Sequence, residues 1–317
     1  QLTKMPEKLP RDAFIDEIYN FAKKDREVYF LSADLGAKSL DQFREELKGQ
    51  FIHTGISEQA MINFASGLAI SGKKVYCYAM APFVTFRPFE QIKVTLASMN
   101  QPVTLLGIGI GYGYDSAGPT HYATEDIGIM RSLGNIEILS PSDTKSVIEA
   151  ARLTYKTPKF RYIRIDRKFL NDIYSDDNFV KDGLKEIYNG KDIAIISSGY
   201  MTHKAIEIRK KLIEDKIDIG VIDIFRIKPI NQIKLLGTLK YYKKIIILEE
   251  HFLSCGLGSI IAEIFMDNRF FIPSLRLGIK DKYFFENNAE KGREYIHKLA
   301  GIDTEGCIAK IKNFIHS

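Results

Sequence analysis

Short apolar runs alternate with helical patterns along this chain, and few folds accommodate that order. The first half contains five strand-like runs, at residues 27–34, 73–80, 101–110, 136–143 and 158–166, and the helical patterns between them lie at 10–23, 57–71, 86–98, 123–133 and 143–155. The strand-like runs are mostly apolar rather than alternately apolar and polar. That composition is typical of parallel strands covered by helices on both faces. The first half is therefore predicted to form an α/β domain.

A polar stretch at 167–186, rich in Asp, Asn and Lys, is the predicted linker to a second domain. The alternation then resumes, with strand-like runs at 191–199, 218–225, 244–250 and 272–279, helical patterns at 202–214, 230–239 and 257–267, and a helical end at 289–315. A length of 317 residues suits two domains of about 100–200 residues each. We predict two doubly wound α/β domains, residues 1–180 and a smaller one at 181–317.

Charge and cysteine content exclude several classes of function. The net charge is +5, but a basic cluster such as Arg209–Lys211 sits beside acids, as on a solvated helix face, so neither a nucleic acid nor a membrane is a predicted partner. The three cysteines are widely spaced and form no CxxC pair, which favours a reducing, cytoplasmic location. No apolar run reaches the roughly 18 residues of a membrane span, and no signal peptide is recognisable.

The helical pattern after Ser57 carries one acid, Glu58, followed by fourteen uncharged residues. Ser57 is a candidate cap for this helix and Gly72 a candidate end. Small residues in its middle, such as Gly67, allow another backbone to approach closely, as at a subunit interface. Glu58 has two interpretations at this point. It is either a helix-terminal charge stabilised by the helix dipole, or a desolvated carboxyl that shares a proton with a ligand nitrogen.

Two further stretches are candidates for ligand contact. Phe83, Phe86 and Phe89 recur every three residues, which is typical of a buried helix stripe, but the neighbouring prolines favour an aromatic slot at a helix entrance. The run "GIGIGYGYDSAGPTHYATED" at 107–126 has alternating glycines without the GxGxxG fingerprint, so a Rossmann dinucleotide site is excluded. It predicts a strand end that opens into a loop, with His121 at the ligand-binding edge of the sheet.

These stretches together resemble the transketolase family of thiamine diphosphate enzymes, in particular its pyrimidine-binding and C-terminal domains. In the first domain the similar segments are "SADLGAKS", "FIHTGISEQ", "FVTFRPFEQ" and "GPTHYATEDI". In the second they are "IISSGYMTHKAIEI", "FRIKPI", "ILEEHFLSCGLGSIIAE" and "LGIKDKYF". The eight segments occur in family order and cover nearly the whole chain.

The resemblance implies how the cofactor is bound and activated. In the family, the glutamate that matches Glu58 bonds to N1′ of the aminopyrimidine ring and thereby helps to remove the proton from thiazolium C2. The aromatic residues Phe83, Phe86 and Phe89 would hold the pyrimidine ring, and Asp34 would lie near the same edge. The protein contributes orientation and electrostatics, and the cofactor acts as the electron sink.

The resemblance also implies which residues contact the substrate, and two positions of this sequence depart from the family pattern. His53 and His121 match positions near the substrate, His121 with a catalytic role. Arg87 and Arg167 are candidate ligands of a substrate phosphate or carboxylate. Two groups that grip the sugar in transketolase itself, a His and an Asp, align here with Gly109 and Ala117. An unusual ketose is therefore expected in place of the ordinary pentose phosphates.

The family also needs a GDG motif, followed some 25–30 residues later by Asn, to hold Mg²⁺ and the diphosphate. This sequence has no GDG, so no metal ligands are predicted on the chain itself. The expectation is a split enzyme in which a second polypeptide supplies the diphosphate-binding domain, assembled as an α2β2 heterotetramer. The substrate is expected to be a small sugar, phosphorylated or otherwise activated.

Three alternatives stay open at this stage. The first is the β subunit of a 2-oxo acid dehydrogenase, which has the same two domains. The second is a relative of 1-deoxyxylulose phosphate synthase, although that enzyme is normally one long chain. The third is a non-catalytic homologue with a regulatory or binding role, against which the retained Glu58 argues. In the second domain, Glu249, Glu250, His251 and Cys255 do not have zinc-ligand spacing and are expected to serve a structural or interface role.

Overall fold

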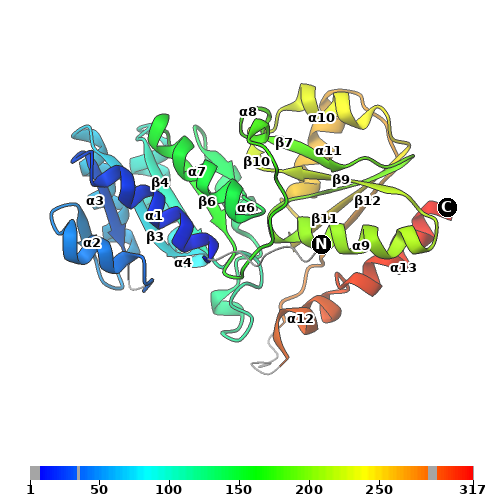
Figure 1. Ribbon diagram of the computed structural model, residues 1–317, viewed down its shortest axis with the longest axis horizontal. Helices are drawn as coiled ribbons and strands as arrows, with labels where there is room; N and C mark the ends of the chain where they lie inside the picture. Colours follow the sequence, from blue (N-terminus) through cyan, green and yellow to red (C-terminus); the bar gives the residue numbers. More distant parts are fainter. Residues whose placement is uncertain (1–7, 34–35, 285–290, 317) are drawn as a thin grey trace.

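The computed structural model describes residues 8–33, 36–284 and 291–316. Asp34, predicted to contact the cofactor, lies outside the described residues. The chain forms two α/β domains side by side, each a central sheet with helices on both faces (Figure 1). Two doubly wound domains are what the alternating sequence pattern predicts. No described helix has the length and apolar character that a membrane span requires.

The first sheet has seven strands in the order β10-β5-β6-β4-β3-β1-β2, and all pairs except β10–β5 are parallel. Successive residues of a strand point to opposite faces, so each strand feeds two hydrophobic layers. In β3, for example, Tyr76 and Tyr78 pack with α1 and α7, while Val75 and Cys77 pack with α3 and α6. The strands are β1 (Val28–Ser32), β2 (Phe51–His53), β3 (Lys74–Met80), β4 (Val103–Ile108), β5 (Glu137–Leu139), β6 (Arg161–Ile165) and β10 (Arg226–Lys228).

The helices of the first domain cover the sheet in the way the apolar periodicity predicts. Most of them lie within the predicted helical ranges, but the pattern at 86–98 is broken by a turn at 86–88 and ends as a π-helix, η1. The bounds are α1 (Pro10–Ala22), α2 (Leu40–Glu46), α3 (Glu58–Ile70), α4 (Ala81–Thr85), α5 (Phe89–Gln91), η1 (Ile92–Ala97), the 3₁₀ turn η2 (Pro119–His121), α6 (Asp126–Arg131) and α7 (Thr144–Lys156).

The second sheet has the order β12-β11-β8-β9-β7, parallel except for the β7–β9 pair. Residues of α9 and α13 pack on one face, and residues of α10 and α11 pack on the other. The strands are β7 (Leu184–Tyr188), β8 (Ile193–Ser197), β9 (Ile219–Ile224), β11 (Lys244–Phe252) and β12 (Ser274–Ile279). The helices are α8 (Asn178–Asp182), α9 (Tyr200–Glu214), α10 (Gln232–Leu239), α11 (Leu257–Asp267), α12 (Gly292–Ala300) and α13 (Thr304–His316).

The two domains share structure at their boundary. One hydrophobic cluster contains residues of both sheets, from Leu31 in β1 to Ile247 in β11. The short strand β10, from the second half of the sequence, pairs antiparallel with β5 of the first sheet. The domain boundary near residue 180 stays a prediction. After that point the chain returns to the first sheet, to which it adds β10 (Figure 1).

The structure differs from the predicted pattern in its short elements. The polar stretch at 167–186 contains α8 and the start of β7, and the sequence pattern also missed α2, β2 and β10. The single helical end predicted at 289–315 is two helices, α12 and α13, separated at Gly301. Elements of three to seven residues show too few repeats of an apolar period to be recognised from sequence.

Candidate active site

The predicted site residues gather at the carboxyl ends of the parallel strands of the first sheet. Ala33 follows β1, Met80 ends β3, and the loop that carries His121 follows β4. Ligands bind at this edge in doubly wound α/β sheets because the loops that follow the strands leave room there. A pocket of about 170 Å³ lies at the edge. Its lining residues are Ala33, Ile56, Glu58, Ala79, Met80, Phe83 and Arg87.

Glu58 is the first residue of α3 and is 3% exposed. The prediction that Ser57 caps this helix through its side chain is wrong. The Ser57 hydroxyl donates instead to the carbonyl oxygen of Thr54 at 2.7 Å, which closes the turn before the helix. Glu58 itself is buried, and its carboxylate faces a mostly apolar pocket. This arrangement fits the aminopyrimidine ring of thiamine diphosphate, which needs flat apolar walls and one carboxylate at a ring nitrogen.

Arg87 holds one side of the Glu58 carboxylate. Its Nη1 lies 2.8 Å from Glu58 Oε2, and its guanidinium carbon lies 4.2 Å from the centre of the Phe83 ring. The Arg87 side chain is 43% exposed, so its other face is open to solvent. Arg87 was predicted to bind a substrate anion, and its contact with Glu58 is an additional role that the sequence did not indicate. A cation against both a carboxylate and a ring is held in a defined orientation.

His121 also contacts the Phe83 ring. The two ring centres are 5.1 Å apart in an edge-to-face arrangement, and His121 Nδ1 lies 2.9 Å from Thr120 Oγ1. Partial burial lowers the pKa of His121, and the nearby positive charge of Arg87 lowers it further. The imidazole is therefore neutral near pH 7, and a neutral imidazole can accept a proton.

Tyr114 connects His121 with Arg167 and was not predicted as a site residue. Its ring centre is 6.3 Å from that of His121, and the Arg167 guanidinium carbon lies 4.8 Å from it on the ring face. Tyr114 packs directly on Gly109, where a Cβ would lie 2.1 Å from the tyrosine ring. The alternating glycines were the signal for this contact, because a glycine at 109 leaves space that a neighbouring side chain fills.

Three predicted residues lie outside this chain of contacts. His53 ends β2 and is exposed at the edge of the same sheet. Phe89 is partly buried against the hydrophobic cluster that joins the two sheets. Phe86 is half-buried in the turn between α4 and α5 and does not line the pocket. The structure thus brings together Glu58, Phe83, Arg87, His121 and Arg167, and the roles predicted for His53, Phe86 and Phe89 stay predictions.

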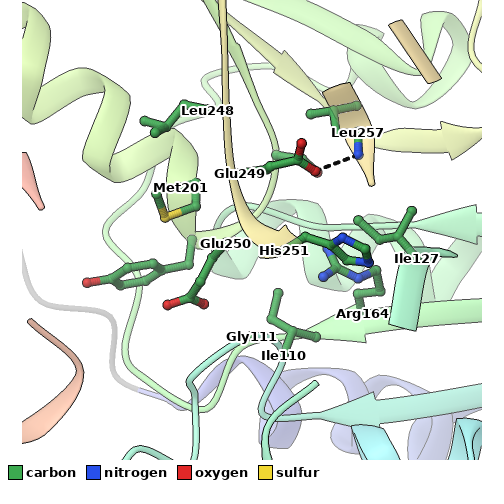
Figure 2. Close-up of a pocket in the computed structure, with 12 residues that line it drawn as sticks. Ile110, Gly111, Ile127, Arg164, Met201, Leu248, Glu249, Glu250, His251 and Leu257 are labelled. Atoms are coloured by element: carbon green, nitrogen blue, oxygen red, sulfur yellow. Dashed lines mark hydrogen bonds between the residues drawn. The ribbon is translucent and has the colours of Figure 1, made fainter. Parts of the chain in front are cut away.

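The second domain meets this edge through residues of β11. Glu249 is 3% exposed and accepts a hydrogen bond from the backbone N–H of Leu257 at 2.7 Å (Figure 2). It also accepts one from the backbone N–H of Gly258 at 3.0 Å. Burial raises the pKa of Glu249 to about 7, and these two hydrogen bonds limit the rise. His251 Nε2 accepts the N–H of Gly128 at 3.3 Å. These contacts agree with the structural role expected for this segment.

A cofactor that carries a diphosphate is bound together with Mg²⁺ in the family, so metal-ligating side chains are the next feature of the site. Within the described parts of the chain, no three His, Cys, Asp or Glu side chains lie close enough together to hold a metal ion.

Sequence models of two protein families match this chain. The model of the transketolase pyrimidine-binding domain matches residues 9–172, and that of the transketolase C-terminal domain matches residues 184–306. Together they cover both sheets and most of the helices described above.

Curated relatives match over nearly the whole chain. An apulose-4-phosphate transketolase subunit of Phocaeicola vulgatus is 30% identical over 96% of this chain and 97% of its own length. The subunit of the same name from Actinobacillus succinogenes is 33% identical over 84% of this chain and 85% of its own length. A 6-deoxy-6-sulfo-D-fructose transketolase subunit of a Clostridium species is 28% identical over 88% of this chain and 87% of its own length.

Solved structures show the same fold. A protein described as "split gene transketolase, inactive beta4 tetramer" superposes with a TM-score of 0.85 and 25% identity, over 97% of this chain and 98% of that one. A transketolase mutant from Pichia stipitis superposes with a TM-score of 0.80 and 18% identity, over 99% of this chain and 47% of the longer chain. The two sequence models and the relative that is 30% identical over 96% of this chain establish that the chain belongs to the transketolase family, with its pyrimidine-binding domain followed by its C-terminal domain.

Proposed function

We propose that this chain is one subunit of a split transketolase, which transfers a two-carbon ketol unit between sugars with thiamine diphosphate as cofactor. The observation that carries the proposal is the buried Glu58 carboxylate in an apolar pocket, with Arg87 at 2.8 Å and His121 beyond Phe83. Relatives that are themselves described as transketolase subunits, matched over almost their full length, support a subunit in place of a whole enzyme.

Glu58 and Phe83 would hold the aminopyrimidine ring of the cofactor. When bound, thiamine diphosphate supplies the electron sink for breaking and forming the ketose carbon–carbon bond. A partner subunit with a GDG…N motif would hold the diphosphate and Mg²⁺. Two parts of one cofactor site would then come from two polypeptides, so neither chain would be active alone.

Glu58 would accept and return a proton at its carboxylate. Its Oε2 is engaged by Arg87 at 2.8 Å, which leaves Oε1 to face a ring nitrogen of the cofactor. With the cofactor in place, the apolar side chains of Met80 and Phe83 would limit the access of water to this contact. A proton shared between two groups in such a pocket moves without competition from bulk solvent.

His121 and Arg167 would bind the substrate. In the tautomer whose Nδ1–H donates to Thr120 Oγ1, the neutral imidazole of His121 can accept a proton from a sugar hydroxyl at Nε2. Among the described residues, no carboxylate lies within ion-pair distance of Arg167, whose guanidinium stacks on Tyr114. Such a guanidinium is available for an anion. Relatives named for a phosphorylated and a sulfonated ketose support a ketose with an anionic group.

The exposed side of α3 would be an assembly surface, as the small residues of this helix predict. Phe64 and Ile70 are each 59% exposed there. A shallow hollow of about 550 Å³ follows the helix, lined by Ala60, Asn63, Phe64, Gly67, Leu68 and Ser71. Exposed apolar side chains that gather along one hollow, unlike single ones, are typical of an interface, and here they favour an α2β2 assembly.

The proposal is tested by reconstitution. The chain is mixed with a partner that carries GDG…N, thiamine diphosphate and Mg²⁺, and ketol transfer from phosphorylated and sulfonated ketoses to an aldose is measured. Turnover by the mixture and none by either chain is the expected result. Substantial turnover by this chain alone would overturn the split site. Turnover only with a 2-oxo acid as donor would replace the transketolase assignment by one of the two alternative enzymes.

A further inference from the structure

The loop at residues 109–122, here called the glycine loop, rests on the second domain. It begins after β4 and carries Tyr114 and His121 to the pocket. Its Gly111 is so close to Glu250 of β11 that a Cβ at residue 111 would lie 1.8 Å from Glu250 Oε2. The N–H of Tyr112 donates to the same oxygen at 3.1 Å. Glu250 points from β11 toward Gly111 (Figure 2), so its carboxylate is a support for the loop backbone.

Arg293, at the start of α12, holds Glu250 and also reaches the glycine loop. Its Nε donates to Glu250 Oε1 at 2.8 Å and its Nη2 donates to Glu250 Oε2. Its backbone N–H donates to Asp115 Oδ2 in the loop at 2.9 Å. Its Nη1 lies 2.8 Å from Asp166, which follows β6 of the first sheet. One arginine of the C-terminal domain thus connects three segments, two of them in the first domain.

These charged groups are almost completely buried. The side chains of Arg293 and Asp166 are 0% exposed, and that of Glu250 is 4% exposed. Burial alone would raise the pKa of Glu250, but Arg293 and His297 hold it well below its usual range. A buried ion pair contributes little net stability over an apolar pair of the same size, so the cluster is weak evidence for a stabilising role. Its directional hydrogen bonds do fix the position of the loop backbone.

We propose that Glu250 and Arg293 are positioning residues for ketol transfer, because they fix the glycine loop and so hold Tyr114 and His121 beside the pocket. This inference rests on the proposed function. The residues that line the pocket around Glu58 all come from the first domain. The inference therefore gives the C-terminal domain a part in catalysis without contact to the reacting atoms.

The test uses the assembled enzyme with two test variants, one control variant and a His121→Ala background. Arg293→Lys keeps a buried cation but loses the forked contact with Glu250. Asp115→Ala removes the loop's contact with the Arg293 backbone and a partly exposed ion pair with Lys168, so it serves where Arg293→Lys does not fold. Arg161→Lys is the matched control, because Arg161 is a buried arginine paired with Glu137 at the opposite end of β6. Each variant is made in the native and in the His121→Ala background. We measure kcat and KM, and amide hydrogen exchange of residues 109–122.

A change in the position of the loop lowers kcat/KM only if the loop carries a group that acts on the substrate. Arg293→Lys is expected to lower kcat/KM about tenfold in the native background and less than about twofold when His121 is already Ala. Asp115→Ala is expected to raise amide exchange in the loop about fivefold, the change that one lost hydrogen bond gives. Arg161→Lys should change neither quantity.

Two results would overturn the inference. The first is an equal loss of kcat/KM in both backgrounds, since the cluster would then act independently of His121. The second is unchanged amide exchange of residues 109–122 in both Arg293→Lys and Asp115→Ala. If the native assembly transfers no ketol unit, the proposed function fails, and the exchange measurement still decides whether the cluster holds the loop.

Discussion

Replacing Glu58 by glutamine should remove activity and leave the fold intact. Glu58 is 3% exposed, but its partner Arg87 has a side chain that is 43% exposed, so water can solvate the guanidinium once the carboxylate is lost. A partly exposed ion pair contributes about 0–1 kcal/mol, and a glutamine oxygen still accepts from Arg87. The free energy of unfolding should therefore fall by at most about 1 kcal/mol, which lowers Tm by about 2 °C in a chain of this length.

The effect on rate should be far larger than the effect on stability. Proton transfer by a positioned side chain contributes about 10²–10⁴-fold in enzymes, equivalent to about 3–5 kcal/mol on the barrier. Glutamine retains the shape of Glu58 and its contact with Arg87 but neither accepts nor returns a proton. The expected result is a fall in kcat within that range, with KM for the sugar nearly unchanged.

The assay uses the reconstituted enzyme with thiamine diphosphate and Mg²⁺. Steady-state ketol transfer gives kcat and KM, and NMR of the bound cofactor gives the exchange rate of its C2 proton. Glu90→Gln is the matched control, because Glu90 is an exposed acid on α5 that does not line the pocket. Near-native C2 exchange in Glu58→Gln would refute the proton-relay role. A loss of Tm much above the expected value would show that Glu58 is mainly a structural residue.

Three other substitutions test the loop, the assembly surface and a buried acid. Gly111→Ala places a Cβ 1.8 Å from Glu250 at a residue with φ of +56°, so a loss of about 3 kcal/mol in the free energy of unfolding is expected in urea titrations. Phe64→Glu should dissociate the assembly in sedimentation velocity. The control Ile233→Glu, at a residue of α10 that is 89% exposed, should leave it intact. The opposite pattern would show that the interface does not include α3. Asp223→Asn should raise Tm relative to the native chain above pH 6 and have little effect at pH 4.

Much of the fold follows from local sequence. The central strands are apolar because helices cover both of their faces, and the sequence pattern therefore located β1, β3, β4 and β6 close to their observed bounds. The pocket was also predictable in part. Glu58 was expected at the start of a helix, and His121, which follows a glycine-rich strand end, was expected at the carboxyl edge of the sheet. Because the strands are parallel, the loops that follow them lie at the same edge of the sheet.

Contacts between distant segments were beyond the reach of the sequence pattern. Arg293 meets Asp166 across 127 positions, and no period or motif links the two. The pairing of β10 with β5 is of the same kind, since a three-residue strand has no recognisable period. The contact of Arg87 with Glu58 across 29 positions needed the turn between α4 and α5 to direct the side chain. Each of these contacts depends on packing of the whole domain.

The pH dependence expected for Asp223→Asn follows from how this acid is buried. Burial raises its pKa from 3.8 to about 6, and hydrogen bonds from Ser142, Thr202 and Tyr174 limit the rise. Between those pH values the folded chain binds a proton that the unfolded chain has released. Stability therefore falls as pH rises through this window, by about 3 kcal/mol for a pKa moved from 3.8 to about 6.

Asparagine does not titrate, so the stability of the variant does not fall as the pH rises through this window. Its side-chain oxygen can accept from Ser142, which lies 2.6 Å from Asp223 Oδ1, and its amide can donate to the hydroxyl of Tyr174. The difference in Tm between variant and native chain should grow from pH 4 to pH 6.5 and then stay constant. Asp267→Asn, an exposed change of the same kind, is the control. A difference that does not vary with pH would mean that Asp223 stays ionised in the folded chain, held by its three hydroxyl donors against the cost of burial.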